Sequence, residues 1–325
     1  MQDNITPLDF TKIPWLQEDY LGLLSRFKSN TPPHALMLYG KEGVGKVLLA
    51  DRLVAGILCR ELNHQQPCGQ CQSCRWLASG FHPDLQEIKG DGEIKVDEIR
   101  SIQQFARLTP ETGKKVVVIK HADRMNLNAA NSLLKVLEEP PSDLYFILET
   151  SGMEKLPITV RSRCQGYFVK PPFMNDALFY LQGIAEARSL DVSADVLHLL
   201  LSISFEAPFK ALNYLDNGYL EKRGLLLQTI HDLLSGELSI AKGVATLLES
   251  EPLAFSYLFF LLIVSFDPQK KEAFPNLMSI FAILDIMPEK LRLMQYEKLV
   301  EIDRLRSSQI RTDWALEAWF VEFMG

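Results

Sequence analysis

One eight-residue run near the start of the chain constrains its fold more than any other feature: Gly40-Lys41-Glu42-Gly43-Val44-Gly45-Lys46-Val47. It follows the pattern G-x-x-x-x-G-K-[ST], in which backbone N–H groups cradle phosphates, the lysine reaches the terminal phosphate and the hydroxyl holds Mg²⁺. Gly40, Gly45 and Lys46 fit the pattern, and Gly43 lies inside it. Val47 breaks it, because an isopropyl group offers no oxygen to a metal ion. The run predicts a degenerate phosphate-binding loop that lacks one Mg²⁺ ligand.

The residues on either side of this loop favour the same interpretation. His34–Tyr39 is a short apolar run typical of a buried strand, and Val47–Arg60 carries apolar residues at helical spacing. Strand, glycine loop and helix therefore follow one another in the order that such a loop requires. A glycine-rich turn that binds nothing is the alternative. The sequence leaves open whether the loop binds ATP or ADP, and Mg²⁺ is not expected.

Strand-like and helical patterns alternate up to about residue 170, after which the strand signals stop. The expected strands cover 84–89, 115–120 and 145–150, and the helices between them cover 96–108 and 127–138. This alternation predicts an α/β fold with a parallel sheet covered by helices. We expect a P-loop-type domain at 1–169 with a cysteine module at 59–74, a small helical lid domain at 170–207 and an all-α C-terminal domain at 208–325.

The composition excludes some classes of function. The formal net charge of −7 speaks against general electrostatic binding of nucleic acid by the whole chain. The densest apolar patch, Leu253–Phe266, is too short to span a bilayer. The first residues, Met1–Asn4, lack the basic and apolar regions of a signal peptide. We therefore expect a cytoplasmic chain without membrane contact.

Four of the five cysteines form the spacing C-x₈-C-x₂-C-x₂-C at Cys59, Cys68, Cys71 and Cys74. Two thiolates in a C-x-x-C turn can bind one tetrahedral metal ion, and four sulfurs fill a closed structural zinc site with no open position for substrate. Disulfides are the competing interpretation, which a reducing compartment disfavours. The spacing predicts a structural zinc ion, and the flanking His64 and His82 are expected to be solvated or capping residues.

The chain also departs from an ATPase where the acidic residues should stand. Lys115–Ile119 has the pattern of a buried strand, after which a P-loop hydrolase presents Asp for Mg²⁺ and Glu for the attacking water. Here Lys120 and His121 follow the strand, and neither replaces the two carboxylates. Asp123 is expected to begin the turn before the next helix. A second catalytic element is therefore damaged.

Three sequence elements together resemble one family. The cysteine module after the P-loop helix, the run Asn131–Pro141 (NSLLKVLEEPP) and the run Thr159–Cys164 (TVRSRC) occur in the order typical of the clamp-loader subunits of bacterial DNA polymerase III, within the AAA+ group. The resemblance covers roughly residues 13–170 well, and the C-terminal third only by its helical character. It implies an AAA+-type domain followed by the helical lid and a helical collar at 208–325.

Within that family, the departures favour the non-hydrolysing delta-prime branch over the hydrolysing gamma/tau branch. A gamma/tau motor subunit would carry Thr at position 47, Asp-Glu at 120–121 and a nucleotide-sensing arginine near Phe209. The motif around Arg163 is kept, and the resemblance implies that this arginine acts in trans on ATP bound by a neighbouring subunit. A planar, permanently charged guanidinium suits the charge that develops on a transferring phosphoryl group. Arg161 is the nearest rival, and Cys164 is expected to be buried and unreactive.

The resemblance also implies partners. It places the chain in a pentameric clamp loader with gamma/tau motor subunits and a delta subunit, acting on the sliding clamp and primed DNA as a component of the polymerase III holoenzyme without ATPase activity of its own. Two alternatives stay open. An active gamma/tau-like P-loop ATPase or nucleotide kinase is opposed by Val47, Lys120 and His121, and a zinc-dependent nucleic-acid-binding protein is opposed by the net charge.

Overall fold

The computed structural model describes residues 13–90, 92–305 and 311–324. The chain divides into two compact units, residues 1–180 and 181–325. The opening residues Met1–Asn4, on which the expected localisation depended, lie outside the described residues. The separate lid and collar domains, divided at residue 207, stay a prediction.

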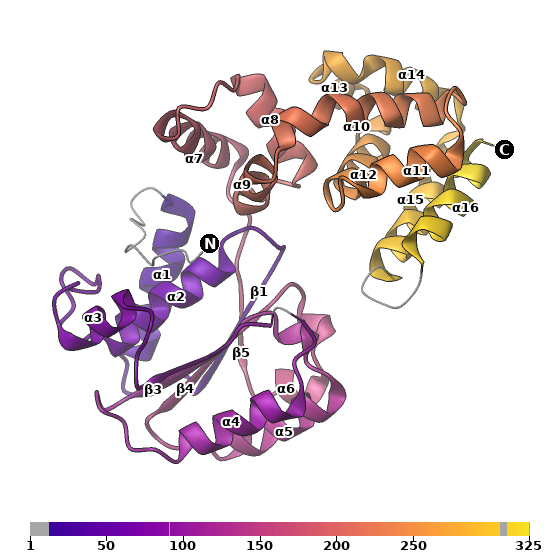
Figure 1. Cartoon of the computed structure of the whole chain (residues 1–325). Helices are drawn as coiled ribbons and strands as arrows, with labels where there is room; N and C mark the ends of the chain where they lie inside the picture. Colours follow the sequence, from indigo (N-terminus) through magenta and orange to yellow (C-terminus); the bar gives the residue numbers. More distant parts are fainter. Residues whose placement is uncertain (1–12, 91, 306–310, 325) are drawn as a thin grey trace. The chain divides into compact units, whose positions relative to one another are not determined.

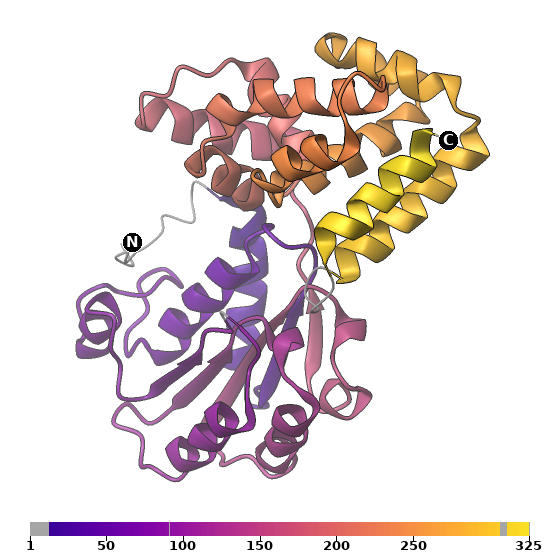
Figure 2. The same ribbon diagram turned by 45° about the vertical axis from the view of Figure 1, so that its right-hand side comes forward.

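The first unit contains a parallel five-stranded sheet with the strand order β2-β3-β4-β1-β5 (Figures 1 and 2). Its strands are β1 (Ala35–Tyr39), β2 (Leu85–Ile88), β3 (Lys115–Ile119), β4 (Leu144–Thr150) and β5 (Gln165–Phe168). Its helices are α1 (Pro14–Phe27), α2 (Lys46–Leu58), α3 (Gln72–Ala78), α4 (Val96–Ala106), η2 (Ala122–Arg124), α5 (Leu127–Glu138), η3 (Met153–Lys155) and α6 (Ile158–Arg161), followed by α7 (Met174–Ala187), in which the boundary between the units falls.

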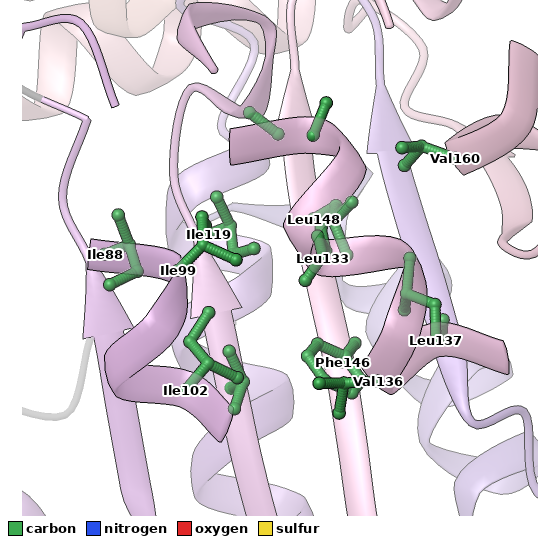
Figure 3. Close-up of a cluster of buried hydrophobic side chains, with 14 of the residues drawn as sticks. Ile88, Ile99, Ile102, Ile119, Leu133, Val136, Leu137, Phe146, Leu148 and Val160 are labelled. Carbon is green, nitrogen blue, oxygen red and sulfur yellow. The ribbon is translucent and has the colours of Figure 1, made fainter. Parts of the chain in front are cut away.

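Alternation of side chains along the strands gives the sheet two apolar faces. One face packs against α4 and α5, whose apolar side chains point at the strands in Figure 3. Phe146 and Leu148 of β4 belong to this face, so Tyr145, Ile147 and Glu149 of the same strand point to the opposite one. There, α1 and α2 cover the sheet (Figure 1). The residues that fill the α4–α5 face include Met37, Ile88, Ile99, Ile102, Val117, Ile119, Leu133 and Leu137.

Helices α1 and α2 pack closely because α2 has a glycine where they meet. A Cβ atom on Gly56 would lie 2.8 Å from the side chains of Tyr20 and Leu24. Tyr20 and Leu24 are buried in α1, and the hydroxyl of Tyr20 donates a hydrogen bond to the carbonyl oxygen of Gln65, 2.9 Å away. This packing fixes α2, whose first residue is Lys46 of the glycine loop.

The sheet and its covering helices confirm the predicted α/β fold. Helix α5 occupies the predicted bounds, and the ends of β2, β3 and β4 each lie within one residue of those expected. The sequence did not reveal β5, because Gln165, Gly166, Tyr167 and Phe168 carry no apolar alternation. This strand lies at the edge of the sheet and pairs only with β1, from Leu36 opposite Gln165 to Tyr39 opposite Phe168.

The second unit is helical among its described residues, as expected. Its helices are α8 (Ala194–Ile203), α9 (Pro208–Asp216), α10 (Tyr219–Leu234), α11 (Ile240–Leu248), α12 (Leu253–Ser265), α13 (Pro268–Glu272), η4 (Pro275–Leu277), α14 (Met278–Ile286), α15 (Glu289–Leu305) and α16 (Thr312–Met324). Helix α12 is almost wholly buried and contacts α8, α13, α14 and α15. Its polar groups are paired: the hydroxyls of Ser256 and Tyr214 lie 2.7 Å apart, and those of Tyr257 and Tyr219 lie 2.8 Å apart.

The burial of α12 also bears on the apolar patch noted in the sequence. Among the described residues, no single helix has both the length and the apolar character needed to cross a membrane. Helices α11 and α12 have the required length and apolar character only when they are taken together, and the chain bends by 114° between them.

Candidate functional site

The glycine run forms a loop between β1 and α2, as the motif predicts. Gly43 and Gly45 have φ angles of 80° and 108°, in the left-handed region that favours glycine. A Cβ atom on Gly40 would lie 2.6 Å from the carbonyl oxygen of Val169, so only glycine allows this close approach. Val44 is buried, and its carbonyl oxygen accepts a hydrogen bond from Nε1 of Trp15 at 3.2 Å. The loop therefore has the backbone shape of a phosphate cradle.

The lysine of this loop, Lys46, is buried and paired with a carboxylate of the same chain. Nζ of Lys46 lies 3.1 Å from Oε1 of Glu149, and each side chain is only 3% exposed. The same ammonium donates a hydrogen bond to the carbonyl oxygen of Lys41, 2.8 Å away. Glu149 comes from the end of β4 on the α2 face of the sheet. Glu149 was not predicted from the sequence, where its only signal is a carboxylate at the end of an otherwise apolar strand.

The lysine after β3 fills the place where a hydrolase needs an acid. Nζ of Lys120 lies 3.0 Å from Oδ1 of Asp51 in α2 and 3.1 Å from Oε1 of Glu87 in β2. Burial alone would lower the pKa of Lys120, but the two carboxylates outweigh it and raise that pKa. Burial raises the pKa of Asp51, and Lys120 offsets part of this effect. The two carboxylates thus favour the charged form of Lys120, which follows β3 where a P-loop hydrolase presents an acid.

His121 and Asp123 have structural partners as well. The backbone N–H of His121 donates to Oε2 of Glu149 at 2.8 Å, with His121 in a left-handed conformation (φ 51°). Asp123 lies in η2, the turn before α5, which confirms the predicted place of this residue. Its Oδ2 accepts a hydrogen bond from the hydroxyl of Ser151 at 3.0 Å. Burial alone would raise the pKa of Asp123, but hydrogen bonds from its own backbone N–H and from Ser151 lower it.

The four predicted metal ligands lie together. The ligand atoms of Cys59, Cys68, Cys71 and Cys74 are all within 4.8 Å of one another, and the sulfur of Cys74 is 3.7 Å from that of Cys59 and 3.9 Å from that of Cys68. A tetrahedral zinc ion with Zn–S bonds near 2.3 Å requires sulfurs about 3.8 Å apart. These separations are far longer than a disulfide bond of about 2.05 Å, and the cysteines are free thiols. The cluster can therefore hold one metal ion.

Backbone groups around the cluster favour thiolate ligands at two of its positions. The N–H groups of Cys68 and Cys71 donate to the sulfurs of Cys59 and Cys68, both at 3.3 Å. Burial alone would raise the pKa of Cys71, but hydrogen bonds from the backbone at Arg60 and Cys74 and from neighbouring thiols lower it to about 6. Backbone hydrogen bonds lower the pKa of Cys68, whereas burial raises the pKa values of Cys59 and Cys74. Metal binding would deprotonate all four.

The two histidines that flank the cluster differ. His64 is exposed, as expected. His82 is buried: its Nε2 lies 2.7 Å from the hydroxyl of Ser73 in α3, and its Nδ1 accepts a hydrogen bond from the backbone of Asp84 at 3.0 Å. Burial lowers the pKa of His82. His82 therefore joins α3 to the start of β2 rather than facing solvent.

Arg163 lies just before the start of β5, whereas the glycine loop follows the end of the neighbouring parallel strand β1. It follows α6 and precedes β5, and its guanidinium donates to Oε1 of Glu138 at 2.6 Å and to the carbonyl oxygen of Thr159 at 2.9 Å. The side chain of Arg163 is 33% exposed and that of Glu138 is 48% exposed. The Nε atom of its rival, Arg161, is buried without a hydrogen-bond partner. Burial raises the pKa of Cys164 to about 12, which agrees with an unreactive thiol.

The fold and these groups define a class of protein: an α/β domain with a P-loop-like glycine loop and its lysine, in which Lys120 and His121 stand where a P-loop hydrolase has its acids. The family model described as "DNA polymerase III, delta subunit" matches residues 17–172. A DNA polymerase III subunit delta' of Pseudomonas aeruginosa is 34% identical over 252 residues, 76% of this chain and 74% of that protein. The Escherichia coli subunit delta' is 32% identical over 224 residues, 67% of this chain and 65% of that protein. A Bacillus subtilis subunit tau is 32% identical over 184 residues, 56% of this chain and 33% of that protein. The chain belongs to the family of DNA polymerase III delta' subunits.

Proposed function

We propose that this chain is a non-hydrolysing subunit of a clamp loader, which loads a sliding clamp onto primed DNA during replication. One observation carries the proposal: a chain of the delta' family has an intact P-loop fold in which Val47, Lys120 and His121 replace the groups that bind Mg²⁺ and activate water. Its partners would be gamma/tau motor subunits and a delta subunit in a pentameric ring. The regions 170–207 and 208–325 would serve as lid and collar.

The replaced groups argue against ATP hydrolysis by this chain. Phosphoryl transfer depends on positioning and on neutralising charge with metal ions, and Lys120 and His121 directly follow β3 where a P-loop hydrolase presents its two carboxylates. The ammonium of Lys120 occupies this position, and it engages the carboxylates of Asp51 and Glu87 that lie nearest to it. The chain therefore contributes to the reaction through groups other than its own loop.

We further propose that Arg163 acts on ATP bound by a neighbouring subunit. Arg163 precedes the beginning of β5, and the glycine loop follows the end of β1. Strands β1 and β5 pair from Leu36 opposite Gln165 to Tyr39 opposite Phe168. At about 3.3 Å per residue, this paired length alone separates Arg163 from the glycine loop by roughly 10 Å. Arg163 therefore lies too far away to serve its own loop. It is exposed enough to reach a partner, and Glu138 and the carbonyl of Thr159 orient it.

The four-cysteine cluster is proposed to hold structural zinc. Four sulfurs complete the tetrahedral coordination of zinc, which leaves no position for substrate or water. The ion would stabilise the module between α2 and β2.

The test of the trans role is Arg163→Ala in a complex reconstituted with gamma/tau and delta subunits. An arginine finger contributes roughly 10³–10⁵ in turnover at the site it serves, so that one site should become nearly silent. Other sites should continue, so the total ATPase rate should fall only in part while clamp loading falls further. Arg163→Lys should also fail, because an ammonium lacks the planar fork of a guanidinium.

One assembly check and two control variants separate the finger from a structural role. Gel filtration must first show that the variant joins the complex, and Arg161→Ala tests the neighbouring guanidinium. Glu138→Gln removes the carboxylate that pairs with Arg163 and should leave activity within a few-fold, since an exposed pair contributes little. Wild-type clamp loading by an assembled Arg163→Ala complex would show that Arg163 is only an interface residue.

A further inference from the structure

The ion pair between Lys46 and Glu149 is not explained by the role of a non-hydrolysing subunit. We propose that the carboxylate of Glu149 is an internal substitute for a nucleotide phosphate, and that it keeps polyphosphates out of the glycine loop. This goes beyond the proposed function, because a subunit that bound nucleotide without hydrolysing it would serve the complex equally well.

The contacts of Lys46 support this assignment. In a working loop, this lysine is the side chain that reaches the terminal phosphate. Here its ammonium is 3.1 Å from Oε1 of Glu149 and 2.8 Å from the carbonyl oxygen of Lys41. These contacts take up two of the three N–H groups of the ammonium, so a phosphate would compete with the carboxylate of Glu149 for its charge.

The contacts of Glu149 lead to the same conclusion. Its Oε1 faces Lys46, and its Oε2 accepts the backbone N–H of His121 at 2.8 Å. The Nδ1 atom of His121 lies 3.6 Å from the same oxygen. An anion that accepts from the loop lysine and from a backbone N–H uses the kind of donor that a phosphate uses in such a loop. Glu149 thus connects the glycine loop to the segment after β3.

Burial makes this substitution effective. Lys46 and Glu149 are each only 3% exposed, so solvent screens their attraction little. Separating them would leave two buried charges without partners, which proteins strongly disfavour. If the paired state holds about 99% of the molecules, the apparent affinity for an incoming phosphate falls about 100-fold. The carboxylate would also repel the phosphate directly.

The test is Glu149→Gln in the full chain, with pyrophosphate and ADP as probes in the absence of Mg²⁺. Isothermal titration should show at least about tenfold tighter binding of both probes than in the wild-type protein, because the pair no longer competes for the lysine. Adding Lys46→Ala to this variant should abolish the gain. The matched control is Glu87→Gln, which removes the same charge from a different lysine, Lys120, and should gain nothing. A folded Glu149→Gln protein without improved binding overturns the proposal.

Labelling of Lys46 gives a second readout that also applies to the wild-type protein. Pyridoxal phosphate with borohydride modifies accessible lysines, and peptide mapping compares Lys46 with the exposed Lys41 five residues earlier. We expect slow labelling of Lys46 in the wild type and fast labelling in Glu149→Gln. Where Glu149→Gln does not fold, Glu149→Asp is used instead. Its side chain is one methylene shorter, so the carboxylate lies farther from Lys46, and Lys46 should be labelled at an intermediate rate. Labelling of wild-type Lys46 as fast as Lys41 contradicts the proposal.

Discussion

The cysteine module should lose its structure when one sulfur ligand is removed, while the sheet stays folded. Helix α3 has only seven residues, too few to be stable alone, and its buried side chains are the small ones of Ser73 and Cys74. The module therefore has little apolar core of its own. A bound metal ion would supply most of the free energy that orders it.

The size of the effect follows from the typical energy of such sites. Structural zinc contributes roughly 10–16 kcal/mol of apparent binding energy in small zinc-binding peptides near pH 7. If Cys71→Ser removes about a quarter of this, some 2.5–4 kcal/mol, the affinity for zinc falls roughly 10²–10³-fold. Metal analysis of protein purified without added zinc should then show near-stoichiometric zinc in the wild type and a sharp loss in the variant.

Deuterium exchange locates the structural consequence. Peptides covering 59–82 should exchange rapidly in Cys71→Ser, whereas peptides from β3 and β4 should stay protected. Fluorescence gives an independent signal, because the ring of Trp76 packs edge-on against His82 with their centroids 5.3 Å apart. Cys164→Ala is the matched control, since this cysteine lies outside the cluster. Full protection of 59–82 in protein proven to be free of metal would refute the reasoning, as would disulfides in freshly reduced protein.

Three further predictions concern Val47 in the glycine loop, Lys120 after β3 and the buried His82. The isolated chain and its Val47→Thr variant should both hydrolyse ATP no faster than background in a phosphate-release assay, because the acids after β3 are still missing; steady turnover by pure wild-type protein would contradict this. Lys120→Ala should lower the free energy of unfolding in urea by about 1–3 kcal/mol, since it leaves the carboxylates of Asp51 and Glu87 unpaired but partly solvated; the double variant with Asp51→Asn should recover part of the loss. Burial holds the pKa of His82 below its ordinary 6.5, so the unfolded chain takes up the proton at a higher pH than the folded chain does. The stability that comes from a neutral, buried His82 is therefore complete above about pH 6.5 and is lost as the pH falls toward the lowered pKa. His82→Asn should therefore show a flatter decline of stability below that pH, and an unchanged slope would show that another group is responsible.

The sequence predicted the centre of the first unit well, because its strands are short apolar runs separated by amphipathic helices. Strand β5 escaped prediction since pairing with β1, rather than its own composition, makes it a strand. The cysteine cluster was visible because its ligands are close in sequence. Glu149 was not, because it meets Lys46 only after parallel pairing places the end of β4 beside the end of β1. The same holds for the partners of Lys120, which come from α2 and β2.

The pairing of Lys46 with Glu149 also affects how glycine-loop motifs are used to assign function from sequence. The lysine of such a motif is usually taken as a sign of nucleotide binding, yet here it forms a buried ion pair with the protein's own carboxylate. A lysine held in this way can persist for stability alone, since losing either partner would leave a buried charge without compensation. A search for nucleotide-binding proteins would become more selective if it also inspected the last residues of the strand beside the loop strand. An acid there, together with an intact lysine, would mark a loop that has become part of the core.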